Sequence, residues 1–194
     1  MRTFADITVS LDGYVTAPGA DIDHGLGVDG EALHNWVFNG DDIDEDVLAL
    51  ATGRSGAVVM GRTLFDVIDG PKGWNEEMGY GAKHATNPPF FVVTHRGRPD
   101  KVRLPHDFSF LPDPKSAIEA ARSVAGDKDV VVMGGGSVIR QCVLDGLVDE
   151  LSLHVSPIVF GGGTPLFTDG DRIELRQSAV RPSANAIHVT YTRA

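Results

Sequence analysis

The chain has 194 residues, a formal net charge of −10 and one cysteine. Its length fits a single domain over residues 1–194. Its acidic balance disfavours nucleic acid as a partner, because phosphate binding needs a basic stripe. Cys142 alone permits neither an internal disulfide nor a thiolate metal cluster. Because the start lacks a secretory pattern and no stretch reaches the roughly 18 apolar residues of a membrane span, we expect a cytoplasmic protein that contacts no membrane.

Short runs rich in β-branched and apolar residues predict six strands, at 4–9, 57–60, 90–94, 130–133, 151–155 and 187–191. The second, third and fourth runs are continuously apolar, which is typical of parallel strands covered on both faces. The last two runs alternate apolar with polar or small residues, and we interpret them as an antiparallel edge.

Helices are predicted between the strands, at 42–51, 64–68, 114–124 and 137–144. The third starts at Asp113-Pro114, a favourable helix beginning. This alternation predicts an α/β protein of three layers, α/β/α, whose ligands bind at the carboxyl ends of the parallel strands. The segments 18–30 and 70–89 are predicted to be loops that frame such a site.

A first candidate site follows the strand at 57–60, where Gly61, Arg62 and Thr63 precede a short helix. Gly61 lets a phosphate approach the backbone, and amides at the helix start point toward it. Arg62 and Thr63 add a charged donor and a hydroxyl donor. The alternative is an ordinary strand-to-helix turn with a solvated arginine.

A second candidate site is the glycine-rich turn after the strand at 130–133, made of Gly134, Gly135, Gly136, Ser137 and Val138. It is similar to a dinucleotide-binding turn but lacks the GxGxxG spacing and a downstream acidic residue for a ribose, which disfavours a Rossmann-type NAD dehydrogenase. Each glycine loses much backbone entropy on folding, so we interpret the run as room for a ligand.

A third candidate site follows the strand at 90–94 and contains Thr94, His95 and Arg96, with Arg98 nearby. A hydroxyl with cations suits the 2′-phosphate of an NADP-type cofactor, whereas an NAD site tends to place a carboxylate there. A surface turn with charged residues for solubility is the alternative.

These motifs occur in the order VVMGRTLFDVI, FFVVTHRGRP and VVVMGGGSVIRQCVLDGLVDELSLHVSPIVFGGGTPLF. In this order they resemble the dihydrofolate reductase superfamily, and SLDGYV, VDEL and SPIVFGGG resemble its branch of riboflavin-biosynthesis reductase (RibD C-terminal) domains. The resemblance covers nearly the whole chain. It implies a dihydrofolate reductase-like fold with a mainly parallel sheet and an antiparallel C-terminal strand, NADPH as hydride donor, a small heterocyclic substrate and a homodimer.

The resemblance also implies roles for the matching positions. Gly61, Arg62, Thr63, Thr94, His95 and Arg96 would contact the pyrophosphate or the 2′-phosphate, and residues 134–138 would cover the pyrophosphate and the nicotinamide ribose. Asp12 would lie near the nicotinamide and the substrate. The substrate pocket would be bordered by Gly13, Pro157, Gly161, Gly162 and Gly163.

Dihydrofolate reductases carry a buried carboxylate, on the helix before the matching strand, that anchors the pteridine and assists its protonation. By distance from Gly61, either Glu45 or Asp46 corresponds to it here, and with Asp12 they are the catalytic candidates. Acidic residues at a helix start also oppose the helix dipole favourably, and that is the alternative for this segment.

The predicted function is NADPH-dependent hydride transfer to a C=N or imine-like carbon of a pyrimidine or pteridine-like compound, resembling 5-amino-6-(5-phosphoribosylamino)uracil reductase. Dihydrofolate reductase activity and a non-catalytic nucleotide-binding protein with the same fold are the alternatives. We expect no metal, because the seven histidines show no paired ligand spacing. Residues that could line the pocket or simply pack are His34, Trp36, Trp74 and Tyr80.

Overall fold

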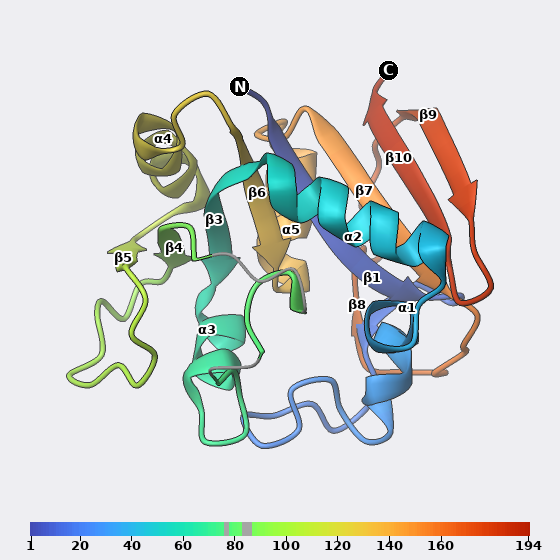
Figure 1. The fold of residues 1–194 in the computed structure, drawn as a ribbon, viewed down its shortest axis with the longest axis horizontal. Coiled ribbons are helices and arrows are strands. Elements are labelled where there is room, and N and C mark those ends of the chain that lie inside the picture. The colour runs from blue at the N-terminus through green and yellow to red at the C-terminus, as the bar shows by residue number, and fades with distance from the viewer. Residues whose placement is uncertain (76–77, 83–86) are drawn as a thin grey trace.

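One eight-stranded sheet forms the centre of the protein, with the strand order β5-β4-β3-β6-β1-β7-β10-β9 (Figure 1). The computed structural model describes residues 1–75, 78–82 and 87–194. The pairs from β5 to β7 are parallel, whereas β10 pairs antiparallel with both β7 and β9. The strands are β1 (Thr3–Ser10), β2 (Tyr14–Thr16), β3 (Ser55–Gly61), β4 (Phe90–Val93), β5 (Phe108–Leu111), β6 (Asp129–Gly134), β7 (Glu150–Ser156), β8 (Thr164–Pro165), β9 (Leu175–Pro182) and β10 (Ile187–Arg193). The short β2 and β8 pair separately.

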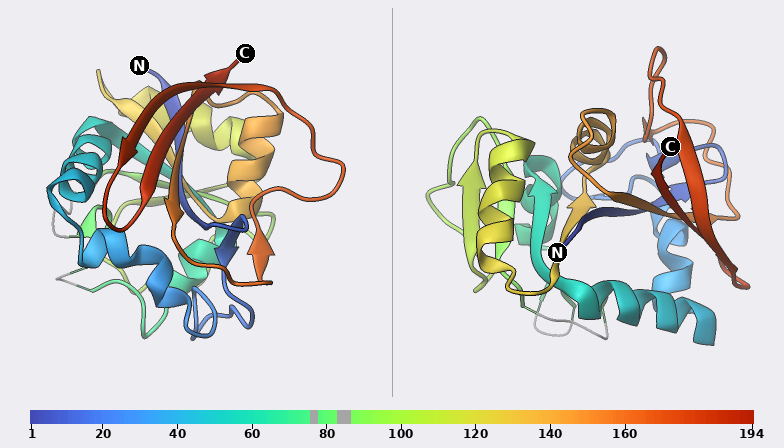
Figure 2. Two further views of the ribbon diagram at one scale, coloured as in Figure 1. Left: turned by 90° about the vertical axis from the view of Figure 1, so that its right-hand side faces the viewer. Right: turned by 90° about the horizontal axis from the view of Figure 1, so that it is seen from above.

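Helices cover both faces of the sheet, which gives the three layers. Figure 2 shows α4 and α5 on one face and α2 on the other. The helices are η1 (Gly30–His34), α1 (Asn35–Phe38), α2 (Asp42–Arg54), α3 (Arg62–Asp69), α4 (Pro114–Val124) and α5 (Gly136–Leu144). Asp41 begins α2 with a capping box that Asp44 completes, and Asp113 caps α4 ahead of Pro114, so both helix starts follow from short-range sequence chemistry.

Alternate residues of the central strands divide the core into two clusters, one on each face. Ala57 and Val59 of β3 pack with α4 and α5, whereas Val58 and Met60 pack with α3. All four are completely buried, as expected for parallel strands that read as continuous apolar runs. The apolar core therefore holds the carboxyl ends of β3, β4 and β6 side by side.

The predicted helices and strands are all present, with ends that agree to within three residues. The interpretation of 151–155 and 187–191 as an antiparallel edge was wrong in part, because β7 pairs in parallel with β1 and because β9 forms the edge. The two histidines of these strands are buried, and the register places them side by side with Thr8 of β1 on the α2 face. Part of the predicted loop 70–89 (76–77 and 83–86) lies outside the described residues.

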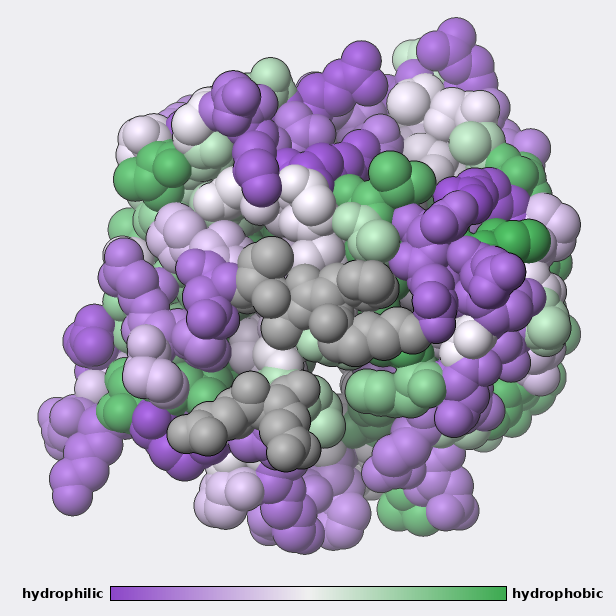
Figure 3. Space-filling view, viewed as in Figure 1, coloured by the Kyte–Doolittle hydropathy of each residue, from purple (hydrophilic) through white to green (hydrophobic). Residues whose placement is uncertain are grey.

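The surface seen in the view of Figure 1 is mostly hydrophilic, and its hydrophobic residues lie in small separate groups (Figure 3). Within the described ranges, the helices are all too short or too polar to cross a membrane. In the same ranges, no group of three or more His, Cys, Asp or Glu side chains is arranged to hold a metal ion.

Candidate functional site

Two adjoining cavities lie beside the carboxyl half of the parallel sheet. The glycine cavity, about 350 Å³, is bordered by residues 134–137 of the β6–α5 turn and by Thr63 of α3. The tryptophan cavity, about 230 Å³, is bordered by Trp36 and Trp74. The residues that line both cavities are Ile7, Thr8, His34, Leu64 and Met133. Because this wall is shared, one elongated ligand or two ligands in contact could occupy the pair.

Each of the three glycines in the glycine turn occupies a different structural environment. Gly134 has φ +145°, a conformation that side chains rarely adopt, and a Cβ on Gly136 would lie 2.8 Å from a methyl carbon of Val15. A Cβ on Gly135 would meet no atom within 4 Å. Folding therefore accounts for two of the three glycines. Of the three, Gly135 alone leaves open space, and this space lies at the N-terminus of α5, where anions are favoured.

The cations of the first and third motifs meet at one carboxylate. Arg62 Nε donates to Asp66 Oδ1 (2.6 Å) and Arg96 Nη2 donates to Asp66 Oδ2 (3.0 Å). The Arg62 side chain is 17% exposed and that of Arg96 is 64% exposed, so Arg96 keeps donors available at the surface. Asp66 balances one of two positive charges, which leaves an excess that suits an anion.

The other predicted cofactor residues divide between the cavity and the turns beside it. Thr63 and Ser137 are exposed and line the glycine cavity. Thr94 is buried, and its hydroxyl accepts from the amide of Arg96 at 3.1 Å, so it shapes the turn that carries the arginine. His95 is exposed in that turn. A Cβ on Gly61 would lie 3.0 Å from a methyl carbon of Val138, which shows how closely β3 and α5 approach.

Asp12 connects two turns at the end of β1. It accepts from the Ser10 hydroxyl (2.6 Å) and from the amides of Phe160 (3.2 Å) and Gly161 (2.7 Å). The Ser10 hydrogen bond, with smaller contributions from these amides, lowers the pKa of Asp12 despite its partial desolvation. The carboxylate therefore holds the 157–163 loop against the β1–β2 turn.

The predicted substrate-pocket residues lie in the same region. Asp12 and Gly13 border a separate cavity of about 520 Å³. The structure describes all of the 157–164 segment, and from this segment Thr164 borders the glycine cavity. The predicted residues of the segment border neither that cavity nor the tryptophan cavity; these residues are Pro157, Gly161, Gly162 and Gly163. A Cβ on Gly163 would lie 2.0 Å from the Thr16 carbonyl oxygen, so this glycine is required by packing.

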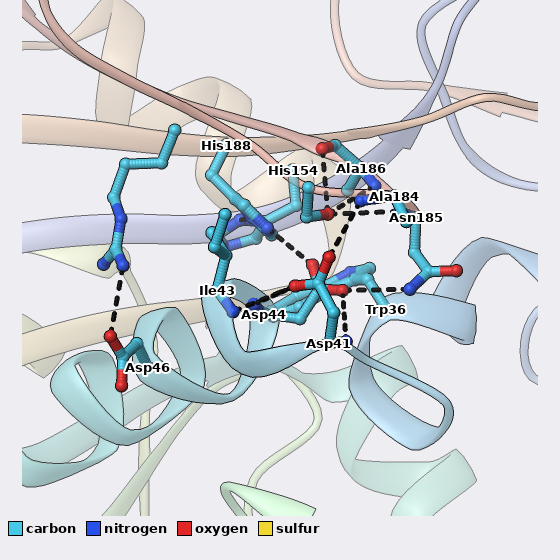
Figure 4. A network of polar contacts seen from close by, with 12 residues as sticks. Trp36, Asp41, Ile43, Asp44, Asp46, His154, Ala184, Asn185, Ala186 and His188 are labelled. Atoms are coloured by element: carbon cyan, nitrogen blue, oxygen red, sulfur yellow. Dashed lines mark hydrogen bonds and ion pairs between the residues drawn. The ribbon is translucent and has the colours of Figure 1, made fainter.

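The buried acid of α2 is Asp44, next to the two predicted positions. Asp46 is exposed and pairs with Arg181 at 3.3 Å, and Glu45 is partly exposed. Asp44 is 0% exposed and accepts from Asn185 Nδ2 (3.0 Å) through Oδ2 (Figure 4). Burial alone would raise the pKa of Asp44, but hydrogen bonds, led by that from Asn185, outweigh it and lower the pKa.

Two histidines extend from Asp44 across the sheet. His188 Nε2 lies 2.8 Å from Asp44 Oδ1, and His188 Nδ1 lies 2.7 Å from His154 Nδ1. His154 Nε2 lies 3.1 Å from Oδ1 of Asp6 on β1. The Trp36 ring packs on His154 with centroids 4.3 Å apart, and Figure 4 shows this side chain beside the pair. Its indole N–H donates to Thr8 Oγ1 at 3.0 Å.

Sequence reasoning missed Asp6, Thr8, His154 and His188, and it assigned His34 only as a possible lining residue. A signal was available: β1 reads Phe4, Asp6, Thr8, Ser10 on one face, which is too polar for a central strand. His34, Trp36, Trp74 and Tyr80 all border the tryptophan cavity. Burial, followed by the neighbouring His154, lowers the pKa of His34 to about 4, so this imidazole is neutral near pH 7.

Comparison with known proteins agrees with this architecture. The model of the RibD C-terminal domain family matches residues 3–189. The uncharacterized protein YyaP of Bacillus subtilis (strain 168) is 24% identical over 200 residues, which cover 98% of this chain and 94% of YyaP.

Two solved structures share the fold. A Thermotoga maritima diaminohydroxyphosphoribosylaminopyrimidine deaminase/5-amino-6-(5-phosphoribosylamino)uracil reductase superposes with a TM-score of 0.68 at 13% identity, over 100% of this chain and 56% of that chain. Enterococcus faecalis dihydrofolate reductase, complexed with NADP(H), superposes with a TM-score of 0.60 at 15% identity, over 99% of this chain and 96% of that one.

Proposed function

The chain belongs to the RibD C-terminal domain family, and from this we propose that it is an NADPH-dependent reductase of a C=N or imine-like bond in a pyrimidine or pteridine-like compound. The observation that carries the proposal is the pair of cavities with a common wall. Such a pair suits a dinucleotide beside a flat heterocycle, which is the arrangement that hydride transfer between two molecules needs.

The glycine cavity has the chemistry to hold the phosphates of NADPH. Gly135 provides open space at the N-terminus of α5, and Ser137 and Thr63 provide hydroxyls. Arg62 and Arg96 converge on Asp66 next to this cavity, and their excess charge suits the 2′-phosphate that distinguishes NADPH from NADH. When bound, NADPH supplies the hydride.

The tryptophan cavity has the chemistry to hold a heterocycle. Trp36 and Trp74 offer aromatic surface, and Thr8, His34 and Asp6 offer polar atoms at the wall. In a mostly apolar pocket a small number of polar groups is enough to fix the orientation of a ligand. These residues would therefore orient the ring while the surrounding side chains exclude water. The 5-amino-6-(5-phosphoribosylamino)uracil reductase activity named for the Thermotoga protein and dihydrofolate reduction are the first two reactions to test.

Titration with NADPH and NADH, followed by nicotinamide fluorescence, tests the cofactor half of the proposal. Arg96→Gln should weaken NADPH binding about tenfold and NADH binding little, because the lost group is a charge-assisted donor of about 1.5 kcal/mol. Arg176→Gln is the matched control, since Arg176 is exposed on β9 at the opposite edge of the sheet. Equal losses for both cofactors would remove the 2′-phosphate role from Arg96, and no NADPH binding at tens of micromolar would refute the proposal.

Stopped-flow oxidation of NADPH tests the chemistry. The panel contains 5-amino-6-(5-phosphoribosylamino)uracil, 7,8-dihydrofolate and simpler cyclic imines. Oxidation that depends on one of these compounds would support a reductase. Tight NADPH binding without oxidation across the panel would favour a nucleotide-binding protein that has kept the fold without this chemistry.

A further inference from the structure

Four ionisable side chains from four elements form one continuous line beneath α2. Asp6 of β1, His154 of β7, His188 of β10 and Asp44 of α2 are joined by contacts of 3.1, 2.7 and 2.8 Å in that order. His154, His188 and Asp44 are buried, whereas the side chain of Asp6 is 22% exposed. We call this set the proton chain.

The contacts between its members fix how many protons the proton chain holds. Each contact is a hydrogen bond only if one proton lies in it, so three contacts hold three protons. Asp44 is ionised, because hydrogen bonds, led by that from Asn185, lower the pKa of its carboxyl group. If Asp6 is also ionised, the two imidazoles carry three protons on four nitrogens and share one positive charge.

A second arrangement keeps every hydrogen bond. If the His154 Nε2 proton moves to Asp6 Oδ1, the histidine pair becomes neutral, and the new carboxyl O–H donates back to His154 Nε2. The Nδ1 to Nδ1 and His188 to Asp44 hydrogen bonds are unchanged. The chain can therefore place a proton on Asp6 without leaving a buried group unpaired, which is the costly event in such networks.

The groups around the histidine pair oppose a second positive charge on it. Arg181 of β9 faces His188 and pairs with Asp46, and Arg54 of α2 pairs with Glu150 of β7. His34 of η1 is neutral because burial lowers its pKa to about 4, and burial raises the pKa of Tyr80 so that its hydroxyl keeps its proton. Burial and then His154 lower the pKa of His188, against the effect of Asp44.

Asp6 is the member of the chain that meets the proposed substrate. It borders the tryptophan cavity, and it also borders a cavity of about 330 Å³ between α2 and strands β7, β10 and β9. His154, His188, Arg54 and Arg181 border this second cavity too, which we call the α2 cavity. The proton chain thus lies between a substrate-sized space and a polar cavity through which protons could be replaced.

We propose that Asp6 is the proton donor for the substrate nitrogen, and that His154, His188 and Asp44 are positioning residues that hold and resupply its proton; this rests on the proposed function. In the step, the C=N carbon gains a C–H bond from the hydride of NADPH, the π electrons form an N–H bond with the Asp6 proton, and NADP⁺ is released. Asp6 returns to the carboxylate, and one proton from solvent refills the chain through the α2 cavity.

Single-turnover oxidation of NADPH between pH 5.5 and 9 tests the catalytic role. Asp6→Asn should slow the step about 100-fold or more at pH 7, as loss of a general acid does, and should remove the alkaline fall in rate. His188→Gln should move the pH at which the rate falls while leaving substrate KM within about twofold. Asp42→Asn, an exposed acid in the first turn of α2, is the matched control. An Asp6→Asn rate equal to wild type in a protein that turns over would overturn the proposal.

Histidine ¹⁵N NMR gives a reading that needs no turnover. At pH 7 the wild type should show protonated Nε2 on both histidines, one far-downfield proton shared by their Nδ1 atoms, and a change in the His154 signals when pterin is added. His188→Gln should lose the shared proton while the protein stays folded by circular dichroism. The proposal would be overturned if both histidines are neutral and share no proton. It would also be overturned if the His154 signals do not change when pterin binds, even if no tested compound is reduced.

Discussion

Replacing the three glycine-turn positions one at a time separates folding constraints from ligand space. Gly135→Ala adds a methyl group in open space, at φ −70°, a value that alanine adopts freely. Gly134→Ala forces alanine to φ +145° and brings Cβ to 3.0 Å from Leu64 Cδ2. Gly53→Ala, in the α2 helix with no atom within 4 Å of the new Cβ, is the matched control.

The structure gives a distinct magnitude for each variant. Gly134→Ala should lower the free energy of unfolding by about 1 to 3 kcal/mol, the cost of a conformation that only glycine adopts readily. Gly135→Ala should change it by less than about 1 kcal/mol, because a weaker N-cap is offset by lower unfolded-state entropy. Its methyl group would instead displace phosphate from one backbone amide, which costs about 1.5 to 3 kcal/mol of binding, or about 10- to 100-fold in Kd.

Urea denaturation and NADPH fluorescence titration measure the two quantities on the same protein. Gly53→Ala should gain about 0.5 to 1 kcal/mol, as expected for glycine to alanine within a helix, and should bind NADPH with wild-type affinity. Wild-type affinity in Gly135→Ala would refute the assignment of the glycine turn as the phosphate site. Full stability in Gly134→Ala would refute the conformational argument.

Two further substitutions test the interior of the site. Trp36→Phe should lower the free energy of unfolding by about 1 to 3 kcal/mol in urea melts at pH 7, because the indole hydrogen bond to Thr8 and part of the packing on His154 are lost; an unchanged midpoint would contradict it. Burial lowers the pKa of His34 to about 4. Between pH 6.5 and 4 the unfolded chain therefore binds a proton at His34 that the folded chain does not bind, and the free energy of unfolding decreases as the pH falls through that range. We expect a decrease on the order of 2 kcal/mol, which is smaller than the full pKa shift would give because the ring borders the cavities. His34→Gln should show that much less loss between pH 7 and 4.5, and parallel losses in the two proteins would contradict it.

The fold could be predicted from sequence where local chemistry decides it. The apolar runs of β3, β4 and β6 predicted parallel strands, because both faces of those strands are covered. The start of α4 followed from Asp113 and Pro114. The edge strand β9 was missed because six of its eight residues are polar, small or proline and all eight are exposed or half-exposed, which gives no apolar pattern.

The candidate site could be predicted only where a motif is local. Gly135 and Thr63 belong to turns that directly follow buried strands, so their positions follow from the order of elements. The histidine pair depends on β7 and β10 pairing at the His154–His188 register, which no local pattern specifies. Glu45 and Asp46 were preferred to Asp44 by distance along the chain, whereas burial depends on which side of α2 faces the sheet, and Asp44 faces His188.

The desolvation free energy of the buried proton chain indicates that these residues have a role beyond packing. Burying ionisable groups carries a desolvation penalty of several kcal/mol per ion, and well-packed apolar side chains in their place are often neutral or stabilising. The opposite face of the same strands is filled in that way, by Ala5, Val9 and Leu151. A fold that packs one face of β1 and β7 with apolar residues has no structural need to place Asp6 and His154 on the other face, in line with His188 and Asp44. That other face borders the tryptophan cavity through Asp6.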